Sequence, residues 1–251
     1  IALSGGLVMN SGNRISKRRL RAQLGARDRR IIDEVLRLRV LSNEAVHALF
    51  LPKSSLNATT KVTARLVKQG WLNAYEFIDR CQYFVAGPKT VQSFGVPTSR
   101  VRPLGPQALA THLAMLDFVS RSIPRLQVMT DREIALLVAS EAESNRGIPH
   151  AVELADSTKM LRLVRVDLGG TPAHLVSKLN ADIRSRVSNS QYANLIAAKK
   201  LVLVTLAPTE TKKSLIETTI RRKSWPNGLR FSVFVTPVLC QLLGGFKSNV
   251  H

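Results

Sequence analysis

The sequence is poor in cysteine, in aromatic residues and in acidic residues, and it contains no long apolar run. Only two of the 251 residues are cysteines, Cys81 and Cys240, which excludes a disulfide framework and a cysteine-based metal cluster. No apolar stretch approaches the ~18 residues that a membrane span requires. We therefore expect a cytoplasmic protein with no membrane partner.

The scarcity of acidic residues leaves a strongly basic chain. Lys and Arg number 37 against 17 Asp and Glu, which gives a formal net charge of +20 and a pI near 11.0. Such an excess usually neutralises a polyanion, because each phosphate contact releases condensed counterions. Double-stranded DNA is the predicted partner. A solubilising surface, a ribosome-like charge bias and an anionic membrane surface are the alternatives.

The first 30 residues contain a basic run that includes Arg18 and Arg19 and no aromatic side chain. We expect this run to lie along DNA phosphates, whereas a solvated tail is the alternative. Met9 is a candidate start of translation, so we expect the apolar residues 1–8 to lie outside the fold.

The pattern in residues 26–96 predicts three short helices followed by a β-hairpin. The first helix begins near Arg27, Ser42 is a good N-cap for the second, and the third begins at Ser54 or Ser55 and ends at Gly70. Two β-prone runs follow, at 71–78 and 82–86. This order of elements is typical of a winged helix-turn-helix domain that binds DNA.

The third predicted helix has two chemically different faces. An apolar stripe of Leu56, Val62, Leu66 and Val67 is expected to be buried, and the opposite face is small, polar and basic. That face suits the major groove, whereas the turn of the hairpin would carry an arginine to a neighbouring phosphate. The predicted DNA-binding residues are Arg18, Arg19, Arg27, Ser55, Asn57, Thr60, Lys61, Lys68 and Arg80.

Pro97, Pro103 and Pro106 indicate a linker, after which residues 107–240 alternate helical and β-prone segments. This alternation predicts an α/β domain with a mixed central sheet, and the whole chain is expected to be α+β. The expected strands are 151–155, 160–167, 201–206 and 230–236. The expected helices are 107–122, 130–140, 174–186, 192–198 and 211–223.

The segments DRRIIDEVLRLRVLSNEAVHALF, at 28–50, and RLVKQGWL, at 65–72, resemble the replication-relaxation family of plasmid and mobile-element proteins. The resemblance covers most of residues 26–236. It implies that the second half is similar to the PD-(D/E)xK nuclease fold of restriction enzymes and of one class of conjugative relaxases. A mobile genetic element, and a relaxase or replication protein as partner, follow from the same resemblance.

The family pattern assigns the nuclease chemistry to Glu133, Asp167 and Lys178, which would hold Mg²⁺ and assist the attacking water. The sequence departs from that pattern at two positions. His150 stands where a metal-binding Asp is expected, and Arg165 replaces a carboxylate, so a Mg²⁺ ion would meet a borderline nitrogen ligand and a cation. Glu133 and Asp167 could instead form an ion pair with Arg165, and Glu153 or Asp156 could supply a ligand if the alignment shifts.

The sequence therefore predicts a site-specific DNA-binding protein with no metal and an inactive nuclease-like domain. It would act as an accessory to processing at a transfer or replication origin, or as a transcriptional regulator. A metal-dependent nickase or relaxase and a dimeric repressor are the alternatives. Cations of the second half could add a non-specific grip on the DNA backbone.

Overall fold

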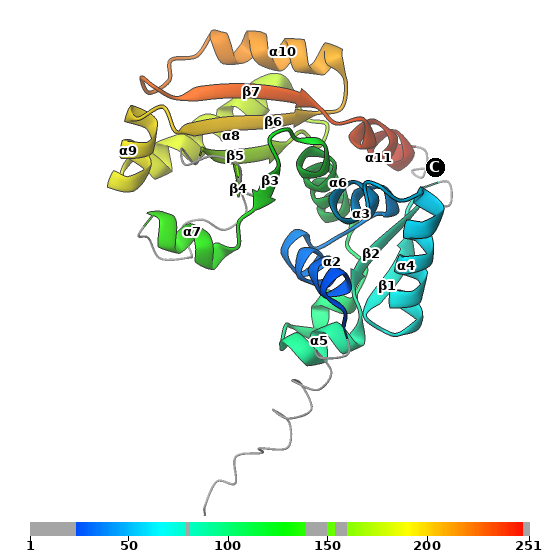
Figure 1. Cartoon of the computed structure of the whole chain (residues 1–251). Helices are drawn as coiled ribbons and strands as arrows, with labels where there is room; N and C mark the ends of the chain where they lie inside the picture. Colours follow the sequence, from blue (N-terminus) through cyan, green and yellow to red (C-terminus); the bar gives the residue numbers. More distant parts are fainter. Residues whose placement is uncertain (1–23, 79–80, 139–149, 154–159, 248–251) are drawn as a thin grey trace, which may run out of the picture.

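The computed structural model describes residues 24–78, 81–138, 150–153 and 160–247. These residues form a mixed α+β fold with two separate sheets (Figure 1). None of the described helices is long and apolar enough to cross a membrane. The elements of the first half are α2 (Ala26–Leu38), α3 (Asn43–Phe50), α4 (Leu56–Lys68), β1 (Leu72–Glu76), β2 (Gln82–Ala86), α5 (Pro88–Phe94), the 3-10 helix η1 (Thr98–Val101) and α6 (Pro106–Arg121).

The first half has the predicted order of three helices and a hairpin. Ser42 caps α3, since its hydroxyl accepts a hydrogen bond from the backbone N–H of Ala45 at 3.2 Å. Strands β1 and β2 pair in antiparallel register, with Leu72 opposite Ala86. Leu41, between α2 and α3, adds a third short strand position by exchanging two backbone hydrogen bonds with Phe84.

The proline-punctuated segment at 97–106 is packed against the hairpin and α2, contrary to the linker that we expected. The Tyr75 hydroxyl donates to the carbonyl of Val101 at 2.8 Å, and the Arg39 guanidinium donates to the carbonyl of Ser99 at 2.8 Å. Proline and glycine punctuation is a local signal, and it does not report such long-range bonds.

The second half contains a five-stranded mixed sheet in the order β3-β4-β5-β6-β7. The β3–β4 and β4–β5 pairs are antiparallel, and the β5–β6 and β6–β7 pairs are parallel. The elements are β3 (Leu126–Val128), α7 (Asp131–Val138), β4 (His150–Glu153), β5 (Leu161–Val166), α8 (Pro172–Val187), α9 (Ser190–Ala197), β6 (Leu201–Ala207), α10 (Glu210–Arg221), β7 (Arg230–Val235) and α11 (Pro237–Lys247).

Helices cover both faces of this sheet. Side chains of α7, α8, α9 and α10 pack on the face that carries Leu163 and Leu203, and α6 and α11 pack on the face that carries Val164 and Val204. The predicted mixed sheet is confirmed, and strand β3 and helices α5 and α11 are additional elements that the sequence pattern did not indicate.

Helix α6 joins the two halves. Its predicted apolar face is buried, and it belongs to one continuous core that also contains residues of α2, the hairpin, the five-stranded sheet and α11. His112, on the same helix, is largely buried, and burial lowers its pKa to about 4. The histidine is therefore uncharged at neutral pH.

Gly87 lies at the junction between α4, the hairpin and α5, where the backbone of two segments comes very close together. A Cβ at this position would overlap the carbonyl oxygen of Gly70 and lie 2.7 Å from the carbonyl carbon of Trp71. We expect Gly87→Ala to lower the free energy of unfolding by about 1–3 kcal/mol, since the obstructing atoms belong to the backbone.

Urea denaturation followed by circular dichroism measures this loss. Gly105→Ala is the matched control, because Gly105 is also the N-cap residue of a helix and has nothing within 4 Å of an added Cβ. Equal transition midpoints for the two variants would contradict the expected close approach.

Candidate nucleic-acid interface

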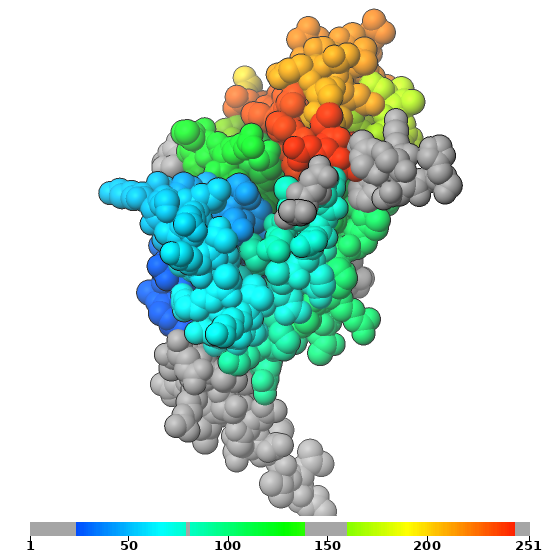
Figure 2. All heavy atoms as spheres, turned by 90° about the vertical axis from the view of Figure 1, so that its right-hand side faces the viewer, coloured from blue at the N-terminus to red at the C-terminus, as the bar shows by residue number. Residues whose placement is uncertain are grey.

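Helix α4 presents an exposed face that lacks acidic residues. Ser55 caps the helix by accepting a hydrogen bond from the N–H of Ala58 at 3.2 Å, and Gly70 beyond its end has a φ of 77°. Exposed Asn57, Thr60, Lys61, Ala64 and Lys68 follow one another at helical spacing. Figure 2 shows the light-blue and cyan atoms of this region at the surface, below the orange and red atoms of the C-terminal helices.

The buried face of α4 differs from the prediction. Thr59, Thr63 and Leu66 are buried, whereas Leu56, which we expected in the buried stripe, is 46% exposed. The hydroxyl of Thr63 donates to Oδ1 of Asn43 on α3 at 2.7 Å. This hydrogen bond allows a polar residue to occupy the contact between α4 and α3.

Asp28 fixes two arginines beside α4. Its buried carboxylate pairs with Arg65 of α4 at 2.7 Å and with Arg27 of α2 at 3.1 Å. The two arginine side chains remain 42% and 46% exposed, so both can still donate outward. Arg27 is among the residues predicted from the sequence, whereas Arg65 is not, because its position depends on a carboxylate 37 residues away.

The predicted DNA-binding residues fall into three groups. Asn57, Thr60, Lys61 and Lys68 share the exposed face of α4, and Arg27 stands beside the helix. Ser55 is exposed, but its hydroxyl already serves as the helix cap. Arg18, Arg19 and Arg80 lie outside the described residues.

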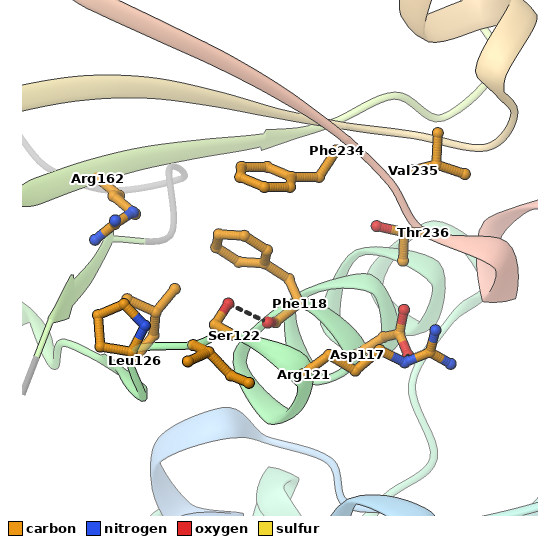
Figure 3. Close-up of a pocket in the computed structure, with 11 residues that line it drawn as sticks. Asp117, Phe118, Arg121, Ser122, Leu126, Arg162, Phe234, Val235 and Thr236 are labelled. Atoms are coloured by element: carbon orange, nitrogen blue, oxygen red, sulfur yellow. Dashed lines mark hydrogen bonds and ion pairs between the residues drawn. The ribbon is translucent and has the colours of Figure 1, made fainter.

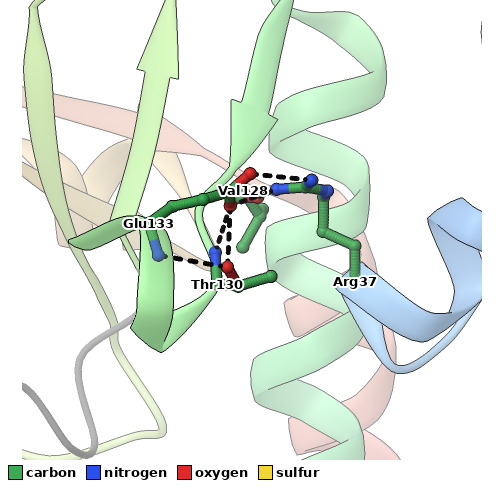
Figure 4. Close-up of polar contacts among 4 residues, drawn as sticks. All are labelled: Arg37, Val128, Thr130 and Glu133. Carbon is green, nitrogen blue, oxygen red and sulfur yellow. Dashed lines mark hydrogen bonds and ion pairs between the residues drawn. The ribbon is translucent and has the colours of Figure 1, made fainter. Parts of the chain in front are cut away.

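Glu133, the first carboxylate of the predicted nuclease site, forms hydrogen bonds with Thr130 and Arg37 (Figure 4). It closes a capping box at the start of α7, where its Oε2 accepts from the N–H of Thr130 at 2.7 Å and its own N–H donates to the Thr130 hydroxyl at 3.3 Å. Arg37 of α2 binds the same carboxylate at 2.5 and 3.0 Å. The Arg37 guanidinium lowers the pKa of Glu133 to about 2, and the Thr130 hydrogen bonds add to this.

The other predicted nuclease residues have separate surroundings. Asp167 is buried after β5, where it accepts from the N–H of Gly169 at 3.0 Å and lies 3.6 Å from the Lys212 ammonium. Lys178 is exposed on α8.

Arg165 forms its ion pair with Asp182 of α8, so the expected pairing with Glu133 or Asp167 is wrong. His150 begins β4 opposite Leu163. Glu153 ends the same strand, and Asp156 lies outside the described residues. The part of the chain described by the structure contains no group of three side chains suited to hold a metal ion. Glu133 and Asp167 bind different partners, Arg37 and Lys212.

The described residues line two notable concavities. One, of about 220 Å³, lies under β7 beside the rings of Phe118 and Phe234, which are tilted against each other, and its carboxylate, Asp117, pairs with Arg121 (Figure 3). The other, of about 610 Å³, lies between α3, the hairpin, α6 and α11. The residues that line these two concavities do not include Glu133, Asp167 or Lys178.

No family model matches the sequence, and comparisons with curated proteins and with solved structures also find no match. The resemblance to the replication-relaxation family therefore rests on the quoted motifs alone.

The Glu133 geometry predicts a pH-dependent contribution to stability. The pKa of Glu133 is lowered from 4.5 to about 2 in the folded state. The Glu133 carboxylate therefore contributes fully to stability at pH values above 4.5, the pKa in the unfolded chain, and this contribution is lost as the pH falls toward 2. We expect Glu133→Gln to destabilise the protein at pH 7 and to do so less at pH 3.5.

Denaturant unfolding at the two pH values provides the measurement. Glu210→Gln is the control, since the Glu210 carboxylate is 74% exposed and pairs only at the surface of α10 with Lys213. A Glu133→Gln protein as stable as the wild type at pH 7 would rule out the structural role.

Proposed function

We propose that this protein binds double-stranded DNA site-specifically through a winged helix-turn-helix domain in its first half. The observation that carries the proposal is the exposed face of α4, which combines Asn57, Thr60 and two lysines with no acidic residue. Asn can bind both N6 and N7 of an adenine in the major groove, and lysines neutralise flanking phosphates.

The surrounding elements support this reading of α4. Three helices precede an antiparallel hairpin, and the Leu41 bridge to Phe84 extends the hairpin to a third short strand. In a winged helix the last of three helices enters the major groove and the hairpin lies beside it. Arg27 and Arg65, held by Asp28, are placed to contact phosphates next to the groove.

The remaining parts of the proposal follow from the sequence. Arg18 and Arg19 would follow the phosphates along the DNA, and Arg80 would contact a phosphate from the turn of the hairpin. Residues 107–240 would be an inactive nuclease-like domain, consistent with the separate ion pairs of Glu133 and Asp167.

The setting that we propose is a mobile genetic element. The protein would assist processing at a transfer or replication origin together with a relaxase or replication protein, or it would regulate transcription. A homodimer would read paired half-sites. Footprinting across the DNA that flanks the gene distinguishes an origin from a promoter.

Substitutions on α4 test the proposal directly. We expect Lys61→Ala to weaken binding to specific and random duplexes alike and to reduce the salt dependence by about one phosphate contact. Asn57→Ala should weaken binding to the specific site by about 1–3 kcal/mol and leave random duplex almost unaffected.

Fluorescence anisotropy over a range of salt concentrations, with a site first found by footprinting, measures both effects. Lys213→Ala is the control, because this lysine lies on α10 and pairs with Glu210. If both α4 variants lost affinity equally for the two duplexes, α4 would not read sequence.

The same proposal predicts that the purified protein does not nick supercoiled plasmid in Mg²⁺ or Mn²⁺, because its candidate carboxylates serve structural contacts. Gel electrophoresis of the plasmid after incubation is the measurement. Nicking that disappears in Asp167→Ala but persists in Glu210→Gln would favour a nuclease instead.

A further inference from the structure

One end of the five-stranded sheet, where β6 and β7 begin, carries a cluster of exposed cations. We call it the basic end, and its residues are Lys199, Lys200, Arg221, Arg222, Lys223 and Arg230. The six come from three separate segments of the chain, which the topology of the sheet brings to one edge.

The parallel strands bring the two lysines and Arg230 together. Lys200 directly precedes β6, and Arg230, the first residue of β7, lies opposite Val202 of β6. Helix α10 connects these parallel strands and runs back along the sheet, so its last residue, Arg221, returns to the same end. Figure 1 shows the ends of α9 and α10 beside the starts of β6 and β7.

The loop after α10 is held firmly in this arrangement. The Trp225 indole N–H donates to the carbonyl of Ile220 at 2.9 Å, and its ring packs against Phe231 with centroids 4.7 Å apart. Gly228 approaches the carbonyl of Ile196 at the end of α9 so closely that a Cβ would overlap it. Arg221, Arg222 and Lys223 therefore project from a fixed loop junction.

Within the described part of the chain, no ion pair compensates these cations. The segments 194–201 and 221–230 contain no Asp or Glu. The nearest acidic residue along α10 is Glu217, one turn before Arg221. The negative ends of α9 and α10 favour a cation each, but two helix ends do not account for six.

Other basic residues of the second half do not belong to this surface. Arg165 is paired with Asp182, and Arg186 is buried, where it donates to the carbonyl of Asp182 and lies over the Tyr192 ring. Arg165 and Arg186 thus stabilise the fold, whereas the six cations of the basic end remain exposed.

We propose that the basic end binds the phosphates of a second segment of double-stranded DNA, so that one molecule holds two segments. It lies on the opposite side of the molecule from α4 in Figure 1, and the shared core through α6 connects the two halves. The six residues are all lysine or arginine, which favours contact with the phosphate backbone over the reading of bases. The bridging, although not the phosphate binding, depends on the DNA-binding function that we propose for α4.

A capture assay tests the bridging. A biotinylated duplex that contains the footprinted site is fixed on beads, the full chain is bound to it, and a fluorescent duplex of random sequence is added. The wild type should retain the fluorescent duplex. The triple variant Arg221→Gln, Arg222→Gln, Lys223→Gln should retain roughly tenfold less while it still binds the fixed duplex, since three phosphate contacts are removed.

A second triple variant serves as a control for the loss of three positive charges. Arg102, Arg125 and Arg132 are also exposed and lie outside the basic end and α4. Their replacement by Gln removes the same charge and should leave capture within about twofold of the wild type. Circular dichroism and the unfolding midpoint of each variant show that the fold is kept.

The outcomes separate this inference from the function of α4. Equal capture by the wild type and the basic-end variant overturns the inference and indicates bridging by other means, such as two copies of the chain. Equal loss in both triple variants also overturns it. Failure of the wild type to bind the fixed duplex refutes the role of α4, and the basic end is then tested by anisotropy with random duplex, where its variant must bind more weakly than the control variant.

Discussion

The position of every other surface depends on the packing of α6 between the two halves of the chain. Leu109 and Leu113 belong to the same buried cluster as residues of α2, the hairpin, the five-stranded sheet and α11. Since protein interiors are close-packed, two elements that share such a core do not move independently without exposing apolar area. The Arg37 contact to Glu133 adds a polar connection between α2 and α7. Helix α4 and the basic end are thus held at fixed positions on one body.

Much of the fold could be predicted from local signals, because those signals act locally in the folded protein. The Ser42 and Ser55 caps and the extent of β2 follow from hydrogen-bonding capacity and β-propensity alone. The segment around Val101 could not be predicted in this way, since its hydrogen bond to Tyr75 joins residues 26 apart. Helices α5 and α11, which the sequence pattern did not indicate, each begin at a proline, a residue that suits the first helical turn.

The residues of the candidate site can also be divided into those whose roles depend on local signals and those whose roles depend on distant partners. The exposed face of α4 could be deduced from helical spacing, whereas the roles of the carboxylates could not. A Glu or Asp can be a metal ligand, a helix cap or an ion-pair partner, and the partner decides which. For Glu133 the Thr130 capping box was readable in the sequence, but its Arg37 partner is 96 residues away. Arg165, one of the two departures from the family pattern, pairs with Asp182 of α8 and not with the carboxylates considered from the sequence.

The internal ion pairs also explain how a chain with 17 acidic residues can present surfaces without them. Asp28, Glu133, Asp167 and Asp182 each face a cation that belongs to the fold, and Asp28 and Asp167 are buried. Carboxylates in these positions are shielded from a bound phosphate backbone, which they would otherwise repel. The same arrangement leaves them without the convergent geometry that a metal centre requires. The proposed DNA-binding surface and the dispersal of the carboxylates would therefore be two consequences of one distribution of ion pairs.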